Sequence, residues 1–334
     1  MSAKQAFSRA AIFHPPDSSR NAPRGAGCNG AAAVKEPAGS FPIEKLTHWS
    51  VPRICNREAI IMRFLLWALA TMAAPLLSIG AALAQTGLAP QAIPQIGSRP
   101  AESTWRISLG AGTFFGPDYP GSNDWRARFI LAPDIRYGDN TFFLSFRDGV
   151  GATLLRSNGF TAGPVARLRF GRDQDDNQAL RGLGDIDPSG EAGAFVSFSD
   201  GPWRAQAELR QGFGGHSGLV ADARIDRVFM VRPDLILSTG PRVSWGSRDF
   251  AETYYGITTD QAARSGYQRF SPDNYWFAGV AGGATWLINQ RWAASLFGEV
   301  GQILGKSADS PLVDQRGSAT QGVVGLALTW RLTQ

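Results

Sequence analysis

The amino-acid sequence predicts an all-β fold, an antiparallel transmembrane β-barrel, from three observations. From Trp105 onward, runs of about ten residues with alternating apolar and polar side chains end in Gly, Pro, Asn or Asp. Alternation with a period of two is typical of a β-strand. Charged residues occupy the polar positions on strand after strand, and aromatic residues gather near the strand ends. This combination is expected of a barrel with lipid outside and water inside.

The run from Pro202 to Arg210 shows the alternation most clearly. Its apolar face carries Trp203, Ala205, Ala207 and Leu209, and its polar face carries Arg204, Gln206, Glu208 and Arg210. A soluble β-sandwich or lipocalin-like barrel also alternates, so alternation alone does not decide between these classes. Aromatic placement favours the outer membrane of a Gram-negative cell, because membrane barrels carry aromatic girdles at both interfaces. The girdle candidates are Trp105, Trp125, Tyr137, Trp203, Trp276, Trp286, Trp292 and Trp330.

About 12 strands are predicted, each bounded by turn-forming residues. They span residues 104–114, 125–137, 140–147, 149–156, 159–171, 190–199, 202–213, 217–231, 234–246, 274–287, 291–303 and 318–332. The segment 141–155 reads either as one strand or as a hairpin turning at Arg147–Gly149, which gives eleven or twelve strands. The hairpin puts every long connection (115–124, 172–189, 247–273, 304–317) on one side, as bacterial barrels require. We therefore expect twelve strands and both termini in the periplasm.

Residues 62–84 resemble a secretory signal peptide. A basic start at Met62–Arg63 precedes an apolar stretch, and Ala82–Leu83–Ala84 before Gln85 has the small-x-small form of a cleavage site. A transmembrane helix is the alternative, but the stretch is short and interrupted by Pro75. We expect cleavage between Ala84 and Gln85, and mass spectrometry of outer-membrane material would identify the mature N-terminus. Peptides from residues 1–61 attached to the folded barrel would contradict this expectation.

Residues 1–61 are expected to be a disordered extension that results from a translation start assigned too early, with Met62 as the true initiator. Their mixture of Pro, Gly, Ser and scattered charge lacks sustained periodicity. A regulatory or lumenal extension is the alternative. Residues 85–103 are expected to be a flexible periplasmic lead, and residues 104–334 the barrel.

The net charge of residues 85–334 bears on whether the protein binds nucleic acid. Residues 1–84 hold nine of the 33 Lys and Arg and four of the 28 Asp and Glu, so residues 85–334 carry 24 of each. The mature chain is therefore neutral, which gives no support for nucleic-acid binding. Both cysteines, Cys28 and Cys55, also precede the expected cleavage site. The mature barrel therefore has no disulfide and no thiolate for a metal or for catalysis.

Over residues 104–334 the chain resembles the MipA/OmpV family of outer-membrane proteins, because a set of loop motifs occurs in the same order along the sequence. They comprise Gly116, Pro117, Tyr119, Gly121 and Ser122 in the first long connection, Gly182, Gly184, Asp185 and Asp187 in the second, Gly215, His216 and Gly218 in a tight turn, and Asp309, Ser310 and Pro311 in the last long connection. The resemblance implies a non-enzymatic envelope scaffold that links a lytic transglycosylase to a peptidoglycan synthase. It also implies contact with outer-membrane lipid and lipopolysaccharide, and some members are osmoregulated or adhesive.

The polar strand faces predict a charged lumen. Its residues are expected to be Arg126, Arg128, Asp134, Arg136, Arg167, Arg169, Arg204, Glu208, Arg210, Asp222, Arg224, Asp226, Arg291 and Glu299. Arginine–carboxylate networks in small barrels are commonly structural, because pairing satisfies charges that lipid excludes. The excess of Arg over acids would instead leave unpaired guanidinium groups and favour anions if water passes. A narrow, weakly anion-selective channel is therefore the alternative function.

His216 and Ser217 are the candidate catalytic pair of a third function, an outer-membrane lipid hydrolase, with adhesion as a further alternative. The surrounding glycines indicate a tight turn in which His216 bonds to backbone, so no catalytic residue is expected. Asp173, Asp175, Asp176, Asp185 and Asp187 form an acidic run, which we interpret as a solvated loop, with a weak cation site as the alternative. We expect no resident metal and no cofactor.

Overall fold

A computed structural model describes residues 104–333 of the chain. The predictions for residues 1–103, including the extension, the signal peptide with its Ala84–Gln85 cleavage site, and the lead, lie outside the described residues. Within the described range, no helix combines the length and the hydropathy needed to cross a membrane.

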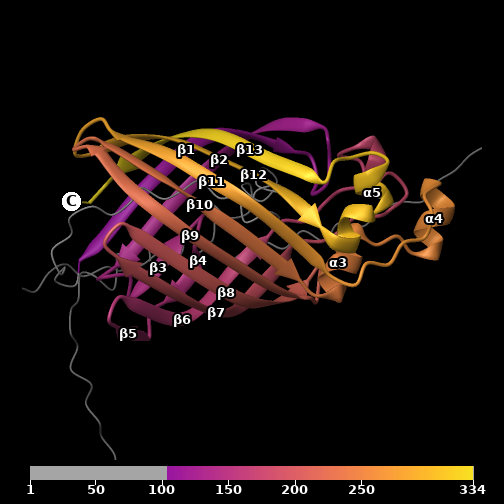
Figure 1. Ribbon diagram of the computed structural model, residues 1–334, viewed down its shortest axis with the longest axis horizontal. Coiled ribbons are helices and arrows are strands. Elements are labelled where there is room, and N and C mark those ends of the chain that lie inside the picture. The colour runs from indigo at the N-terminus through magenta and orange to yellow at the C-terminus, as the bar shows by residue number, and fades with distance from the viewer. Residues whose placement is uncertain (1–103, 334) are drawn as a thin grey trace, which may run out of the picture. The chain divides into compact units, whose positions relative to one another are not determined.

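The described residues form a β-barrel with short helices in its long connections (Figure 1). The strands are β1 (Trp105–Pro117), β2 (Trp125–Tyr137), β3 (Phe142–Ser145), β4 (Gly149–Ala152), β5 (Leu155–Ser157), β6 (Phe160–Arg169), β7 (Ser189–Asp200), β8 (Trp203–Gly214), β9 (Leu219–Arg232), β10 (Leu235–Gly246), β11 (Tyr275–Leu287), β12 (Trp292–Leu304) and β13 (Thr320–Arg331). The helices are η1 (Gln178–Leu180), α3 (Arg248–Tyr255), α4 (Thr259–Ser265), η2 (Gly305–Asp309) and α5 (Pro311–Asp314).

The sheet closes on itself to form the barrel wall. Twelve strand positions lie around its circumference, as the sequence predicts, because β4 and β5 share one of them. Neighbouring strands pair antiparallel, β1 pairs with β13, and β4 pairs with β6. The segment predicted as one strand over 149–156 is divided into β4 and β5, which both pair with β6. The division lies at Thr153 and Leu154, where the Thr153 amide bonds to Thr141 and the Leu154 amide bonds to Ala162. Closure satisfies backbone groups that lipid cannot.

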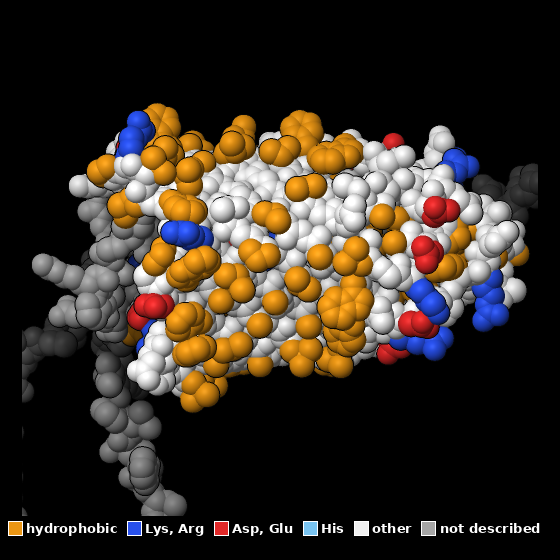
Figure 2. All heavy atoms as spheres, viewed as in Figure 1, with side chains coloured by type: hydrophobic (Ala, Val, Ile, Leu, Met, Phe, Trp, Pro, Cys, Tyr) orange, Lys and Arg blue, Asp and Glu red, His pale blue; other side chains and the backbone are white. Residues whose placement is uncertain are grey.

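The barrel is apolar outside and charged inside. On β8, Leu209 is 51% exposed, whereas its neighbours Glu208 and Arg210 are 6% and 2% exposed. Large apolar side chains are likewise exposed on β11, β12 and β13, at Val280, Leu296 and Leu326. Figure 2 shows hydrophobic side chains scattered over the wall and charged side chains near its two ends. This arrangement is opposite to that of a soluble barrel and is the one that lipid requires.

Two aromatic pairs lie where the girdle is predicted. The Trp105 and Tyr137 ring centroids are 4.9 Å apart, and the Trp292 and Trp330 rings stack at 6.0 Å. All four residues lie at the end of the barrel where the hairpin turns are short. Asn140 and Asn158 take positive φ angles of 59° and 49° in two of these turns, a conformation that Asn tolerates better than most residues.

The long connections fold over the other end of the barrel as a cap, which we define as residues 118–124, 170–188, 247–274 and 305–319. Figure 1 shows α3, α4 and α5 together at this end. The sequence prediction treats these segments as loops and misses the helices. One signal was present: Thr258 and Gln261 form a capping box at the start of α4.

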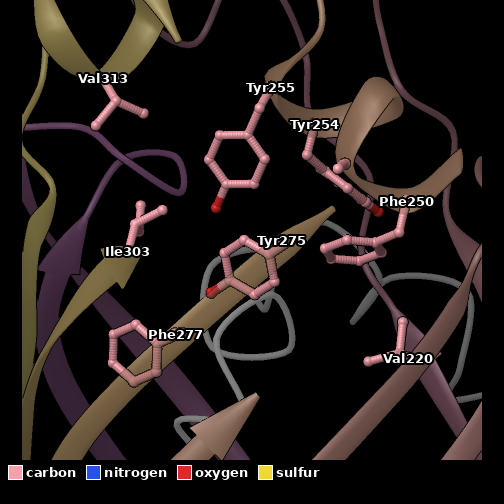
Figure 3. Packing of buried hydrophobic residues seen from close by; sticks show 9 residues of the cluster. Val220, Phe250, Tyr254, Tyr255, Tyr275, Phe277, Ile303 and Val313 are labelled. Carbon is pink, nitrogen blue, oxygen red and sulfur yellow. The ribbon is translucent and has the colours of Figure 1, made fainter. Parts of the chain in front are cut away.

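Apolar side chains from all four segments hold the cap together. Tyr119, Leu180, Ile257 and Leu312 come one from each segment and share a buried cluster. A second cluster joins α3 to the strands, and Figure 3 shows Phe250 and Tyr255 next to Tyr275 of β11, with Tyr254 beside Phe250. Hydrogen bonds reinforce the packing, as from Ser310 Oγ to the Tyr255 carbonyl oxygen at 2.7 Å. The cap is therefore a packed layer rather than a set of independent loops.

Candidate functional site

A network of guanidinium and carboxylate groups lies inside the barrel, and Glu191 of β7 is at its centre. The Glu191 carboxylate accepts hydrogen bonds from Arg169 Nε and from Arg210 Nε, the latter at 2.8 Å. His216 Nε2 lies 3.1 Å from the same carboxylate. The Glu191 side chain is 1% exposed, so three donors replace its hydration. Arg210 also pairs with Glu208 and Asp222, which extends the network across β8 and β9.

The tip of the β3–β4 hairpin forms a second part of the network. Asp148 in this tip pairs with Arg136 of β2 at 2.7 Å and with Arg224 of β9 at 2.8 Å. Phe146, two residues earlier, packs against an inner cluster of the wall that includes Phe114 and Phe297. The tip therefore enters the lumen instead of extending the wall, and its charges connect opposite sides of the barrel.

Most of the predicted lumen residues meet in this network. Besides the groups above, Arg167 pairs with Glu208 at 2.6 Å, Arg136 pairs with Asp134 at 2.8 Å, and Asp226 pairs with Arg242 at 2.6 Å. Glu299 of β12 is partly buried and forms no ion pair within 4 Å in the described part of the chain. The expected surplus of several unpaired guanidinium groups is wrong, because carboxylates absent from the prediction, Glu191 and Asp148, pair with them.

Four predicted lumen residues lie near the barrel ends instead. Arg126 and Arg128 reach toward the cap, where Arg126 pairs with Asp118 at 2.9 Å and Arg128 donates to the Pro117 and Asp118 carbonyl oxygens. Arg204 is exposed and donates to the Gly201 and Trp203 carbonyl oxygens at the short-turn end. Arg291 is exposed and precedes β12, so its assignment to a lumenal strand position is wrong.

Four network residues were missed from sequence: Arg147, Asp148, Glu191 and Arg242. Glu191 lies on the same face of β7 as buried Ser189, and Arg242 lies on the same face of β10 as buried Ser244. Alternation could have found both. Arg147 and Asp148 lie in a turn, where alternation gives no direction, so no sequence signal pointed to them.

His216 and Ser217 do not form a nucleophile–base pair. His216 is buried, whereas Ser217 is exposed beside it. The Gly218 amide donates to His216 Nδ1 at 3.2 Å, which assigns the proton to Nε2 and its bond to Glu191. Neither ring nitrogen is then available to Ser217. Gly212 makes room for this ring, because a Cβ there would lie 2.2 Å from His216 Cε1.

The loop motifs lie in the cap and its rim. Tyr119 is buried, and burial raises its pKa to about 12. Gly121 has a φ of 96° and donates its amide to Gln321 at 3.0 Å. In the acidic run, Asp185 accepts the Gln174 amide and Asp176 pairs with Arg126 at 3.5 Å. Across the described residues, no group of His, Cys, Asp and Glu has a metal-binding arrangement.

The closed ladder, apolar exterior and charged interior define the class: a β-barrel of the bacterial outer membrane. The family model described as "MltA-interacting protein MipA" matches residues 109–332. The chain therefore belongs to the MipA family.

Two curated relatives are named MltA-interacting protein, from Escherichia coli (strain K12) and Shigella flexneri. Each is 25% identical over 97 residues, which cover 29% of this chain. The match spans only 38% of the length of each relative.

Solved structures with similarity to this chain include the NanC porin and the outer membrane protein OprD from Pseudomonas aeruginosa. NanC has a TM-score of 0.39 and 7% identity over 68% of this chain and 100% of its own. OprD has a TM-score of 0.32 and 11% identity over 70% of this chain and 66% of its own. These scores are too low to bear on the function of this chain.

Proposed function

We propose that this barrel is a non-enzymatic envelope scaffold that retains a lytic transglycosylase and a peptidoglycan synthase on its periplasmic side. The observation that carries the proposal is membership of a family described by its interaction with MltA. A lumen crossed by paired charges and by a hairpin tip favours a structural barrel over a wide solute path. Both nitrogens of His216 are engaged, which disfavours hydrolase chemistry.

In this proposal the short-turn end faces the periplasm, and the cap faces the cell exterior with its lipopolysaccharide. Barrels of this class place short turns in the periplasm and long loops outside. The docking surface for the murein enzymes is then the short-turn end. Arg232 and Asp234 are exposed there and form an ion pair, with Arg232 Nη2 3.1 Å from Asp234 Oδ2. Arg204 and Arg291 lie at the same end and add exposed positive charge.

Affinity capture tests the scaffold. Full-length protein in detergent is expected to retain a purified lytic transglycosylase, and the double variant Arg232→Glu, Arg291→Glu is expected to retain less, because it reverses two charges of the docking end. The matched control is Arg269→Glu, which reverses one exposed charge in the cap and should leave retention unchanged. Equal loss in both variants, or no retention by the unaltered protein, would contradict the scaffold.

A narrow, weakly anion-selective channel is the second candidate, although carboxylates pair with most lumenal guanidinium groups and so give anion selectivity less support than the scaffold. Planar bilayer recordings separate it from the scaffold. A scaffold should give no steady conductance. Conductance with anion preference and no retained enzyme would favour the channel, and the absence of both activities would favour adhesion through the cap.

A further inference from the structure

Arg172 is a buried cation without a carboxylate partner. It follows β6, where its amide and carbonyl form a bridge with Ile186 at 2.8 Å each. The residue is 7% exposed, and its Nη1 donates to the Tyr254 carbonyl oxygen at 3.2 Å. Among the described residues, no carboxylate lies within 4 Å of its guanidinium, and burial lowers its pKa to about 10. A buried charge of this kind is costly unless an opposite charge compensates it.

Two more unsatisfied polar groups lie in the same neighbourhood. Arg172 Nε, Arg169 Nη1 and Tyr254 Oη are all buried without a hydrogen-bond partner in the described structure. Tyr254 connects them, because its carbonyl oxygen binds Arg172 and its ring centroid lies 6.0 Å from the Arg169 guanidinium carbon. Figure 3 shows Tyr254 beside Phe250 on the inner side of α3. The Phe250 ring centroid lies 5.0 Å from the same guanidinium carbon.

The neighbouring carboxylates of the lumenal network are already paired with other arginines. Glu191, Glu208 and Asp222 pair with Arg167, Arg169 and Arg210, and none of them pairs with Arg172. Glu191 already accepts from two arginines and contacts His216, so it has little capacity for Arg172. Water could fill the missing hydrogen bonds but would leave Arg172 without an ion-pair partner.

We propose that a small oxyanion of the carboxylate or phosphate class binds beneath the cap, between the side chains of Arg169, Arg172 and Tyr254. Guanidinium groups bind both anions through charge-assisted hydrogen bonds, and a phenol adds a neutral donor. A bound anion gives Arg172 the ion-pair partner that it lacks. The site is independent of the scaffold function, since it lies at the cap end and not among the short turns.

Binding to the full chain in detergent tests the site. Isothermal titration with sodium acetate and, separately, with sodium phosphate is expected to show saturable binding that sodium chloride at equal ionic strength does not. Comparison of the acetate and phosphate titrations shows which oxyanion the site prefers. The variant Arg172→Gln is expected to weaken binding about tenfold or more, because it removes a charged donor. The matched control is Arg181→Gln, an exposed arginine on the same connection, which should bind as the unaltered protein does.

A second variant keeps the test decisive if Arg172→Gln does not fold. Tyr254→Phe keeps the ring above Arg169 and removes only the unpartnered hydroxyl group, so it should fold and bind the oxyanion more weakly. Saturable binding that neither substitution weakens would place the ion elsewhere and overturn the proposal. Titrations with acetate and phosphate that match chloride would overturn it as well, and would mean that water alone occupies the site.

Discussion

Replacing Glu191 with alanine is expected to lower the free energy of unfolding by about 3–5 kcal/mol, because it leaves the buried Arg169 guanidinium without its carboxylate and removes one of three carboxylates from Arg210. Arg169 and Arg210 both pair with Glu191, and the side chains of all three residues are at most 5% exposed. Urea titrations of folding into lipid vesicles would measure the change.

The matched control for Glu191 is Glu252→Ala on α3. Glu252 also pairs with an arginine, Arg248, at 2.8 Å, but both side chains are exposed. Solvent and salt screen an exposed pair of this kind, so this variant should be nearly neutral. Similar costs for the two substitutions would show that the Glu191 network does not stabilise the barrel.

Replacing Ala207 with arginine is expected to cost about 2–4 kcal/mol if the residue lies near the bilayer midplane, because it places a charge against lipid. Ala207 lies in the middle of β8, opposite Val196 of β7 and Ala223 of β9, on the exposed apolar face. The same vesicle titrations would measure this cost.

The control for this position is Ala207→Leu, which enlarges the side chain and keeps it apolar. It should cost far less than arginine, since lipid accommodates the larger chain. An arginine variant as stable as the leucine variant would mean that this face of β8 meets water. The lipid-facing and lumenal sides of the wall would then have to be exchanged.

Alternation predicted the wall from sequence because its cause is local. Each long strand buries one face in the lumen and presents the other to lipid, so the period of two persists along β1, β2 and β7 to β13. The predicted ends differ by only a few residues. The β3–β4 hairpin was predicted too long, because alternation continues through Phe146 although the chain there leaves the wall.

Tertiary contacts decided the parts that sequence reasoning missed. The helices α3 and α4 have eight and seven residues, too few for a clear helical period, and α3 is fixed mainly by burying Phe250, Tyr254 and Tyr255. The contact between His216 and Glu191 joins residues 25 positions apart through a tight turn. Neither residue pattern nor spacing specifies such a contact.

The inward hairpin tip changes how one part of the wall is held together. β3 pairs with β2 at only four positions, from Asp134 to Tyr137, and β4 pairs with β6 at two. Around the tip, Asp148 bonds to Arg136 and Arg224, and Arg167 donates to the Arg147 carbonyl oxygen. Side-chain ion pairs therefore supplement short backbone ladders here, whereas the long strands elsewhere are joined by longer backbone ladders. Protons and competing ions weaken ion pairs far more than they weaken backbone hydrogen bonds, so this is the part of the wall whose stability responds most to the ionic state of the interior.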